Sequence, residues 1–144
     1  FVFLSGFFCS PAQYTLVSLN GSGPSFPNIP DAKDYHTALR LAIEDINGNS
    51  TILPQTTLSL ENHAHGGLPS VAISKMIEFS EKNQTLVLGN PYSFISVLTG
   101  AVGDVYGVAQ LSSIATSSSL SNKQKYPFYS RMSPASFGQV NAII

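Results

Sequence analysis

Charged residues and cysteine are both scarce in this sequence of 144 residues. Charged side chains make up only 10% of it, the formal net charge is -1, and the charges occur singly. Nucleic-acid binding requires a basic surface that neutralises phosphates, so we expect no nucleic-acid partner. The one cysteine, Cys9, lies near the beginning of the chain, which excludes a disulfide framework and a cysteine-ligated zinc site in the remainder. No cofactor is predicted.

Hydrophobic residues are plentiful, at 43%, which is enough for one compact domain or for a piece of a larger one. The first apolar run, residues 1–9, is too short to span a bilayer and is followed by Ser10, Pro11 and Ala12, which suit a cleavage site before Gln13. This pattern favours a signal-peptide remnant at 1–12 over a buried first strand. Residues 13–144 contain no evident domain boundary.

Three acceptor sequons for N-glycosylation agree with export of the chain. They begin at Asn20, Asn49 and Asn83. Such triplets also arise by chance, but each of these falls in a polar stretch between apolar periodic segments. We therefore expect a glycan at each asparagine to stand in solvent.

Segments with the pattern of strands alternate with segments that have the pattern of helices. The strands are short apolar runs or are rich in β-branched and aromatic residues, whereas the helices repeat apolar residues every three or four positions. This alternation predicts an α/β fold, in which helices cover both faces of a parallel sheet and the crossovers are right-handed. The expected strands are 14–19, 56–62, 86–89, 109–114 and 126–129, and the expected helices are 31–48, one from about Ser70, 93–106, and one beginning at Ser133 and Pro134.

In an open parallel sheet, ligands bind beyond the carboxyl ends of the strands, so the loops after the strands are the candidate sites. The loop at 20–23 contains two glycines, but it lacks the G-x-G-x-x-G spacing and the Walker lysine, which favours a plain connection. His63 and His65 follow the second strand. A metal site there needs a third ligand, so a solvated pair is favoured. His36 is expected to be a surface or half-buried helix residue.

The turn after the third strand, 90–93, directs backbone N–H groups and the Ser93 hydroxyl toward this edge. Anions bind at such a helix N-terminus because its donors are unpaired and carry partial positive charge. The alternatives are that Ser93 only caps the helix, or that it is a nucleophile, although the G-x-S-x-G motif is absent.

The serine-rich stretch 112–119 follows the fourth expected strand, and its apolar flanks favour a working loop over a linker. The backbone carbonyls of Ser113 and Ile114 and the hydroxyls of Thr116 and Ser117 can accept hydrogen bonds from an ammonium group. With the donors near Ser93, they outline a site for a carboxylate and an amine, which is the outline of an amino acid.

Two groups of motifs carry a family resemblance over about residues 14–144. The pattern L-x-x-A-I-E-D-I-N at 39–47, followed by Ile52, Leu53 and Pro54, resembles the first helix of the receptor-family ligand-binding region, which has the type I periplasmic-binding-protein fold. Leu88 and Gly89, S-x-x-S at 93–96, and the segment 115–128 with Arg131 and Pro134 are similar to the GABA-B receptor branch of the class C G-protein-coupled receptors.

The resemblance implies roles for particular residues. In class C receptors, a serine at the start of the third helix holds the carboxylate of the ligand, and a serine or threonine after the fourth strand helps to hold it and its amine. These positions match Ser93 and Thr116, and Ile114 offers a backbone carbonyl.

The resemblance also implies a Rossmann-like N-terminal lobe of an extracellular Venus-flytrap module, incomplete at its C-terminus and not an enzyme. A small amino-acid-like ligand would favour closure of a second lobe of the same chain, in a membrane receptor able to dimerise at the plasma membrane. The alternatives are the ectodomain of a receptor guanylyl cyclase, a soluble solute-binding protein and, less favoured, an α/β serine hydrolase-like enzyme.

Overall fold

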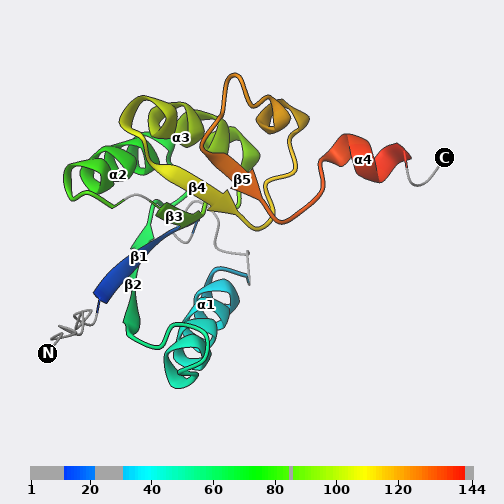
Figure 1. Ribbon diagram of the computed structural model, residues 1–144. Helices are drawn as coiled ribbons and strands as arrows, with labels where there is room; N and C mark the ends of the chain where they lie inside the picture. Colours follow the sequence, from blue (N-terminus) through cyan, green and yellow to red (C-terminus); the bar gives the residue numbers. More distant parts are fainter. Residues whose placement is uncertain (1–11, 22–30, 85, 142–144) are drawn as a thin grey trace, which may run out of the picture.

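The computed structural model describes residues 12–21, 31–84 and 86–141. Their strands form one five-stranded sheet in the order β2-β1-β3-β4-β5, and every neighbouring pair is parallel (Figure 1). The α/β fold with a parallel sheet is therefore confirmed. The strands are β1 (Ala12–Asn20), β2 (Thr56–Ala64), β3 (Leu86–Gly89), β4 (Ala109–Ser112) and β5 (Tyr129–Arg131).

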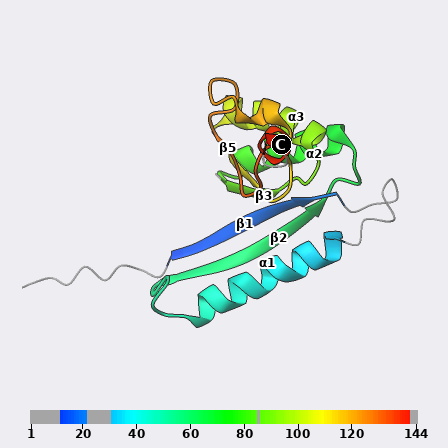
Figure 2. The same cartoon turned by 90° about the vertical axis from the view of Figure 1, so that its right-hand side faces the viewer.

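Helices cover both faces of the sheet, as the alternating pattern predicts. Figure 2 shows α1 (Asp31–Gly48) against one face, and α2 (Pro69–Glu81) and α3 (Ser93–Tyr106) against the other. The chain leaves β1 for β2 on one side and later returns past β1 to β3 on the other. The point between β1 and β3 is thus the topological switch point, beside which ligands bind in sheets of this kind.

The buried part of β1 is its carboxyl end. Nine residues of β1 pair with β2, from Ala12 opposite Thr56 onward, but only Val17 to Leu19 also pair with β3. Val17 and Leu19 are accordingly fully buried, whereas Tyr14 is exposed. The sheet is therefore best packed at the edge where ligands are expected.

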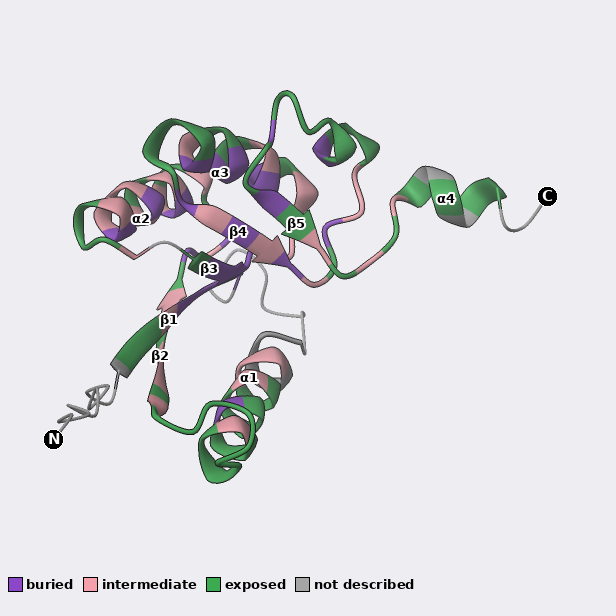
Figure 3. Ribbon diagram, viewed as in Figure 1, coloured by how far each residue is buried: buried purple, intermediate pink, exposed green. Residues whose placement is uncertain are grey.

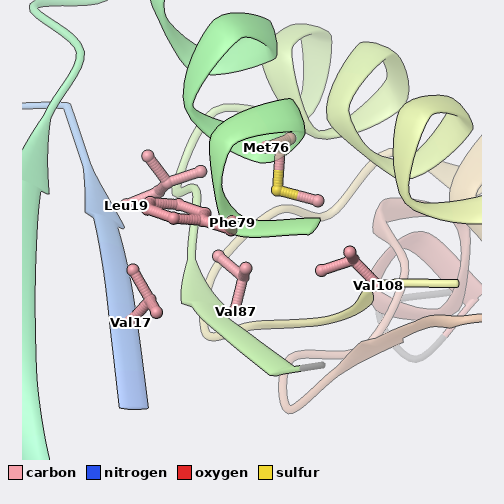
Figure 4. Close-up of a cluster of buried hydrophobic side chains, with 6 residues drawn as sticks. All are labelled: Val17, Leu19, Met76, Phe79, Val87 and Val108. Carbon is pink, nitrogen blue, oxygen red and sulfur yellow. The ribbon is translucent and has the colours of Figure 1, made fainter. Parts of the chain in front are cut away.

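Two apolar clusters hold the α2 and α3 face together. Figure 3 shows the buried residues concentrated between these helices and the central strands. Gly103 lets α3 approach the backbone closely, because a Cβ at this position would lie 2.5 Å from the carbonyl oxygen of Val108. The larger cluster is drawn in Figure 4 and contains Val17, Leu19, Met76, Phe79, Val87 and Val108; the second contains Ala115, Leu120, Tyr126 and Tyr129.

Several boundaries predicted from the sequence are wrong by two or three residues. β1 begins at Ala12 instead of Tyr14, and β2 ends at Ala64 instead of Asn62. The fourth strand ends at Ser112, because the Ser112 hydroxyl accepts a hydrogen bond from the N–H of Ala115 and closes a turn. The fifth begins at Tyr129 instead of Tyr126, because the N–H of Tyr126 bonds to Asn122 in another turn. The last helix, α4 (Ser136–Asn141), begins after Pro134, and a short 3-10 helix, η1 (Ser118–Ser121), interrupts the serine-rich stretch.

Helix α1 forms where its periodicity predicts, but it is less buried than that pattern indicates. Ile43 is buried, Tyr35 is half-buried, and Ala38 and Ala42 are exposed.

The proposed signal-peptide remnant at 1–12 lies outside the described residues except for Ala12, and Cys9 lies outside them as well. The signal-peptide remnant and the inferences drawn from Cys9 therefore stay predictions.

Candidate functional site

The turn from β3 into α3 lies at the switch point, and two consecutive residues in the left-handed region form it. Gly89 has φ 100° and Asn90 has φ 63°. A Cβ on Gly89 would lie only 2.5 Å from the carbonyl oxygen of Leu19, so no side chain fits there. The N–H of Asn90 donates to the same carbonyl at 3.0 Å. The turn is thus fixed against the end of β1.

A cluster of buried polar side chains surrounds Asn90. Its carbonyl oxygen accepts hydrogen bonds from the hydroxyls of Ser96 and Ser112, both at 2.9 Å. Its side-chain Nδ2 donates to the Thr99 hydroxyl at 3.3 Å, and that hydroxyl donates to Gln110 Oε1 at 2.8 Å. These residues are at most 1% exposed, and we call them the inner polar cluster: Asn90, Ser96, Thr99, Gln110 and Ser112.

The N-terminus of α3 has no side-chain cap. Tyr92 is the residue before the helix and its side chain makes no capping hydrogen bond, and Ser93 is the first residue of the helix. The interpretation of Ser93 as a cap is therefore wrong. The Ser93 hydroxyl instead accepts a hydrogen bond from the N–H of Ser117 at 3.2 Å. Because the first N–H groups of a helix have no partner within it, this end of α3 can bind an anion.

The loop after β4 brings the other predicted site residues to Ser93. Ser117 touches Ser93 directly, and the carbonyl oxygen of the adjacent Thr116 accepts hydrogen bonds from the backbone and the hydroxyl of Ser136. No group in the described residues bonds to the Thr116 hydroxyl. We call the half-buried residues Ser93, Ser113, Thr116 and Ser117, together with Ile114, the outer polar cluster.

The two predicted carbonyl acceptors differ in their surroundings. The carbonyl oxygen of Ser113 already accepts a hydrogen bond from the Ser133 hydroxyl, whereas Ile114 has a side chain that is 53% exposed. A carbonyl oxygen has two lone pairs, so Ser113 can accept one further hydrogen bond. The structure therefore brings Ser93, Thr116 and Ser117 together and leaves Ile114 at the rim.

Arg131 shapes this loop, a role that the residue patterns had not assigned. Its guanidinium donates to the carbonyl oxygens of Ser117 at 2.7 Å and Ala115 at 3.4 Å, and also to the Ser121 hydroxyl. The five N–H donors of a guanidinium lie in one plane, so one arginine can bind several carbonyl oxygens of the same loop. The signal in the sequence was an arginine that follows the serine-rich stretch.

Two tyrosines also line the edge without having been predicted there. Burial raises the pKa of Tyr35 above its ordinary value, and an interaction with the Ser113 side chain opposes this rise. Tyr92 lies over Gly21, since a Cβ on that glycine would be 2.2 Å from the tyrosine ring. Desolvation likewise raises the pKa of Tyr92. Both phenols are thus held in the neutral form at neutral pH.

The two histidines after the second strand are not the solvated pair that the sequence favoured. His63 packs edge-on against Phe79, with ring centres 5.0 Å apart, and His65 is only 1% exposed. Burial lowers the pKa of His65 below its ordinary value. Within residues 12–21, 31–84 and 86–141, no three His, Cys, Asp or Glu side chains lie close enough to hold a metal ion. His36 is half-buried, as expected.

The glycosylation sequons differ in exposure. Asn20 is 2% exposed and its Nδ2 donates to Asn62 Oδ1 at 2.6 Å, so it lacks the solvent-facing side chain that the sequence predicted. Its position at the end of β1, between two neighbouring strands, explains this burial. Asn49 and Asn83 are exposed and stay candidate acceptors.

The protein thus has an α/β fold with clusters of polar side chains beside the switch point of its parallel sheet. Residues 35–144 match the family described as the receptor family ligand binding region, and the chain belongs to that family. The resemblance drawn from the sequence motifs is thus confirmed. This family and its relatives are receptors and not enzymes, in agreement with the prediction.

Three curated proteins to which the chain is similar are named as receptors or receptor subunits. The chain is 28% identical over 99 residues, 68% of its length, to the gamma-aminobutyric acid type B receptor subunit 1 of Caenorhabditis elegans. It is 27% identical over 107 residues, 74% of its length, to the subunit 1 of Mus musculus, and 29% identical over 106 residues, also 74%, to glutamate receptor 3.1 of Oryza sativa subsp. japonica. Each match covers 11% of the relative, so the chain spans about a tenth of their length. Among the described residues, no helix combines the length and apolar character needed to cross a membrane.

Proposed function

We propose that this chain is one lobe of an extracellular receptor module that binds a small amino-acid-like ligand at the carboxyl edge of its sheet. The observation that carries the proposal is the hydrogen bond from the Ser117 N–H to the Ser93 hydroxyl. It joins the loop after β4, which carries Thr116 and Ser117, to the N-terminus of α3, where Ser93 is the first residue. Membership of a ligand-binding receptor family supports the same conclusion.

The two parts of an amino acid would use different groups in this site. A carboxylate would accept hydrogen bonds from the first N–H groups of α3 and from the hydroxyls of Ser93 and Thr116, aided by the helix dipole. An ammonium group would donate to the carbonyl oxygens of Ile114 and Ser113. Binding would then depend on hydrogen bonds to a charged ligand, each of which contributes about 1.5–3 kcal/mol.

The finer parts of the function are proposals of the same kind. A ligand held by this lobe and touching a second lobe of the full-length chain would favour the closed arrangement, which a transmembrane region would convert into G-protein signalling. Such a receptor would present this lobe on the extracellular side of the plasma membrane, able to dimerise, with glycans at Asn49 and Asn83 and with residues 1–12 as a signal-peptide remnant. The names of the relatives make γ-aminobutyrate and glutamate the first ligands to test.

The test is ligand affinity in the complete protein. Titration with γ-aminobutyrate, glutamate and the common amino acids would identify a probe that binds, and Ser93→Ala and Thr116→Ala should each weaken it about tenfold or more. Ser118→Ala is the matched control, because Ser118 is exposed in η1 near the same loop. Unchanged affinity in both site variants, with a probe that binds the unaltered protein, would remove the site assignment.

A further inference from the structure

His65 lies at the carboxyl edge, yet the proposed ligand contacts do not use it. It follows β2, its backbone N–H donates to the carbonyl oxygen of Asn20 at 3.0 Å, and its own carbonyl accepts from Leu68 at 2.9 Å. The side chain is 1% exposed and touches the ring edge of Tyr92, with centres 6.1 Å apart. A histidine buried this deeply has no contact with solvent or with a ligand at the rim, so any role must act through a neighbour.

The hydrogen bonds of the ring determine where its proton lies. The N–H of Gly67 donates to His65 Nδ1 at 3.1 Å, so Nδ1 carries a lone pair. In a neutral imidazole the proton is then on Nε2, which must act as a donor. The lowered pKa of His65 keeps the ring neutral near pH 7, and the side chain of Asn90 interacts with it. Nε2 is buried, but no acceptor lies within ordinary hydrogen-bond distance among the described residues.

Asn90 has a buried acceptor without a hydrogen-bond partner in the described residues, whereas His65 has a buried donor without one. Its N–H, its carbonyl oxygen and its Nδ2 all make hydrogen bonds, to Leu19, to Ser96 and Ser112, and to Thr99. Only Oδ1 is buried without a partner in the described part of the chain. A buried donor and a buried acceptor on neighbouring side chains cost free energy unless they satisfy each other.

We propose that His65 is a positioning residue, whose Nε2–H binds Asn90 Oδ1 and so holds the turn that presents Ser93. Asn90 would then connect four parts of the edge: β1 through Leu19, α3 through Ser96 and Thr99, β4 through Ser112, and the end of β2 through His65. The bond would span the switch point and connect the end of β2, an edge strand, to the inner polar cluster. The structural part of this inference stands without a ligand, whereas its effect on affinity rests on the proposed function.

Hydrogen–deuterium exchange of the ligand-free complete protein tests the structural part. His65→Leu removes the donor and should speed exchange of the hydrogen-bonded amides of Asn90 and Ser96 by about fivefold to tenfold, the equivalent of one lost hydrogen bond. His65→Gln keeps an N–H donor of similar reach and should restore the slow exchange. His63→Leu is the matched control, because His63 lies in β2 and packs on Phe79 of α2, so its loss should leave the exchange of the Asn90 and Ser96 amides unchanged.

A double-mutant cycle separates this bond from general packing. Asn90→Gly keeps the left-handed backbone and removes Oδ1, so it should itself speed exchange, and adding His65→Leu should have little further effect. The Asn90→Gly variant also tests the proposal if His65→Leu does not fold, because slow exchange in Asn90→Gly would by itself overturn it. Equal exchange in His65→Leu and the unaltered protein, or no rescue by glutamine, would overturn it as well.

Titration with γ-aminobutyrate and glutamate tests the consequence for the site. His65→Leu should weaken a probe about threefold to tenfold and His65→Gln should restore the affinity. If neither probe binds the unaltered protein, the ligand class in the proposed function fails while the exchange measurements still decide the role of His65. If a probe binds and Ser93→Ala weakens it but His65→Leu does not, the proposed function stands and the positioning role in binding is overturned.

Discussion

The inner and outer polar clusters share one edge of the sheet but differ in burial and in bonding. Asn90, Thr99 and Gln110 are almost fully buried and bond to one another. Ser93 and Thr116 are half-buried, and the Thr116 hydroxyl has no partner in the part of the chain that the structure describes. The inner set therefore stabilises the edge, whereas we propose that the outer set binds the ligand. Substitutions should separate these purposes.

The largest effect should come from Asn90→Ala. This variant places a Cβ-bearing residue without a polar side chain in the left-handed region and removes the Nδ2 bond to Thr99, so unfolding free energy should fall by about 3 kcal/mol. Urea denaturation of the whole ligand-binding region measures it. Asn83→Ala is the control, because Asn83 has φ 56° but is exposed, and it should cost only the backbone strain of about 1 kcal/mol. Equal losses would mean that the inner cluster contributes nothing.

Thr99→Val should come next. Valine has nearly the same shape, but it leaves Gln110 Oε1 and Asn90 Nδ2 without the hydroxyl that joins them, at a cost of about 1–3 kcal/mol. Thr57→Val in the exposed part of β2 is the control and should change stability by less than about 0.5 kcal/mol. Thermal denaturation compares the two variants, and indistinguishable melting temperatures would contradict the assigned role.

A smaller loss of stability should appear on acidification. The pKa of His65 is lowered in the folded protein, so as pH falls below about 6.5 the unfolded chain binds a proton before the folded one does. Stability should therefore decrease with falling pH until folded His65 is protonated, and above pH 7 this contribution should be constant. The pH dependence of unfolding, compared with that of His65→Gln, isolates this histidine because His36 and His63 are present in both. Parallel curves would disprove the effect.

The smallest effect on stability should be that of Ser93→Ala. Its hydroxyl accepts one hydrogen bond at a half-buried position, so unfolding free energy should change by no more than about 1 kcal/mol while ligand affinity falls. Denaturation and ligand titration on the same preparation provide the comparison. A loss of stability as large as that of Asn90→Ala would place Ser93 in the inner cluster instead of the outer one.

The sequence predicted the elements and the place of the outer cluster, for reasons that are local. A period of two or of 3.6 residues depends only on near neighbours, and parallel strands bring the residues that follow them to one edge. Ser93 and the 113–117 loop were therefore found from position alone. The strand boundary at Tyr129 was missed because the turn around Asn122 outweighs the aromatic pattern of the residues before it.

Burial was decided only by the tertiary structure. Ser112 and Asn90 are 22 residues apart in the sequence and meet at the edge, and Arg131 reaches back to the carbonyl groups of the loop after β4. Asn20 and His65, expected in solvent, are enclosed because β1 lies between β2 and β3. By itself the sequence determined which segments form strands and helices and which polar residues follow them. The order of the strands decided which of those polar residues are enclosed and which stay partly exposed at the edge, because that depends on contacts between segments distant in the chain.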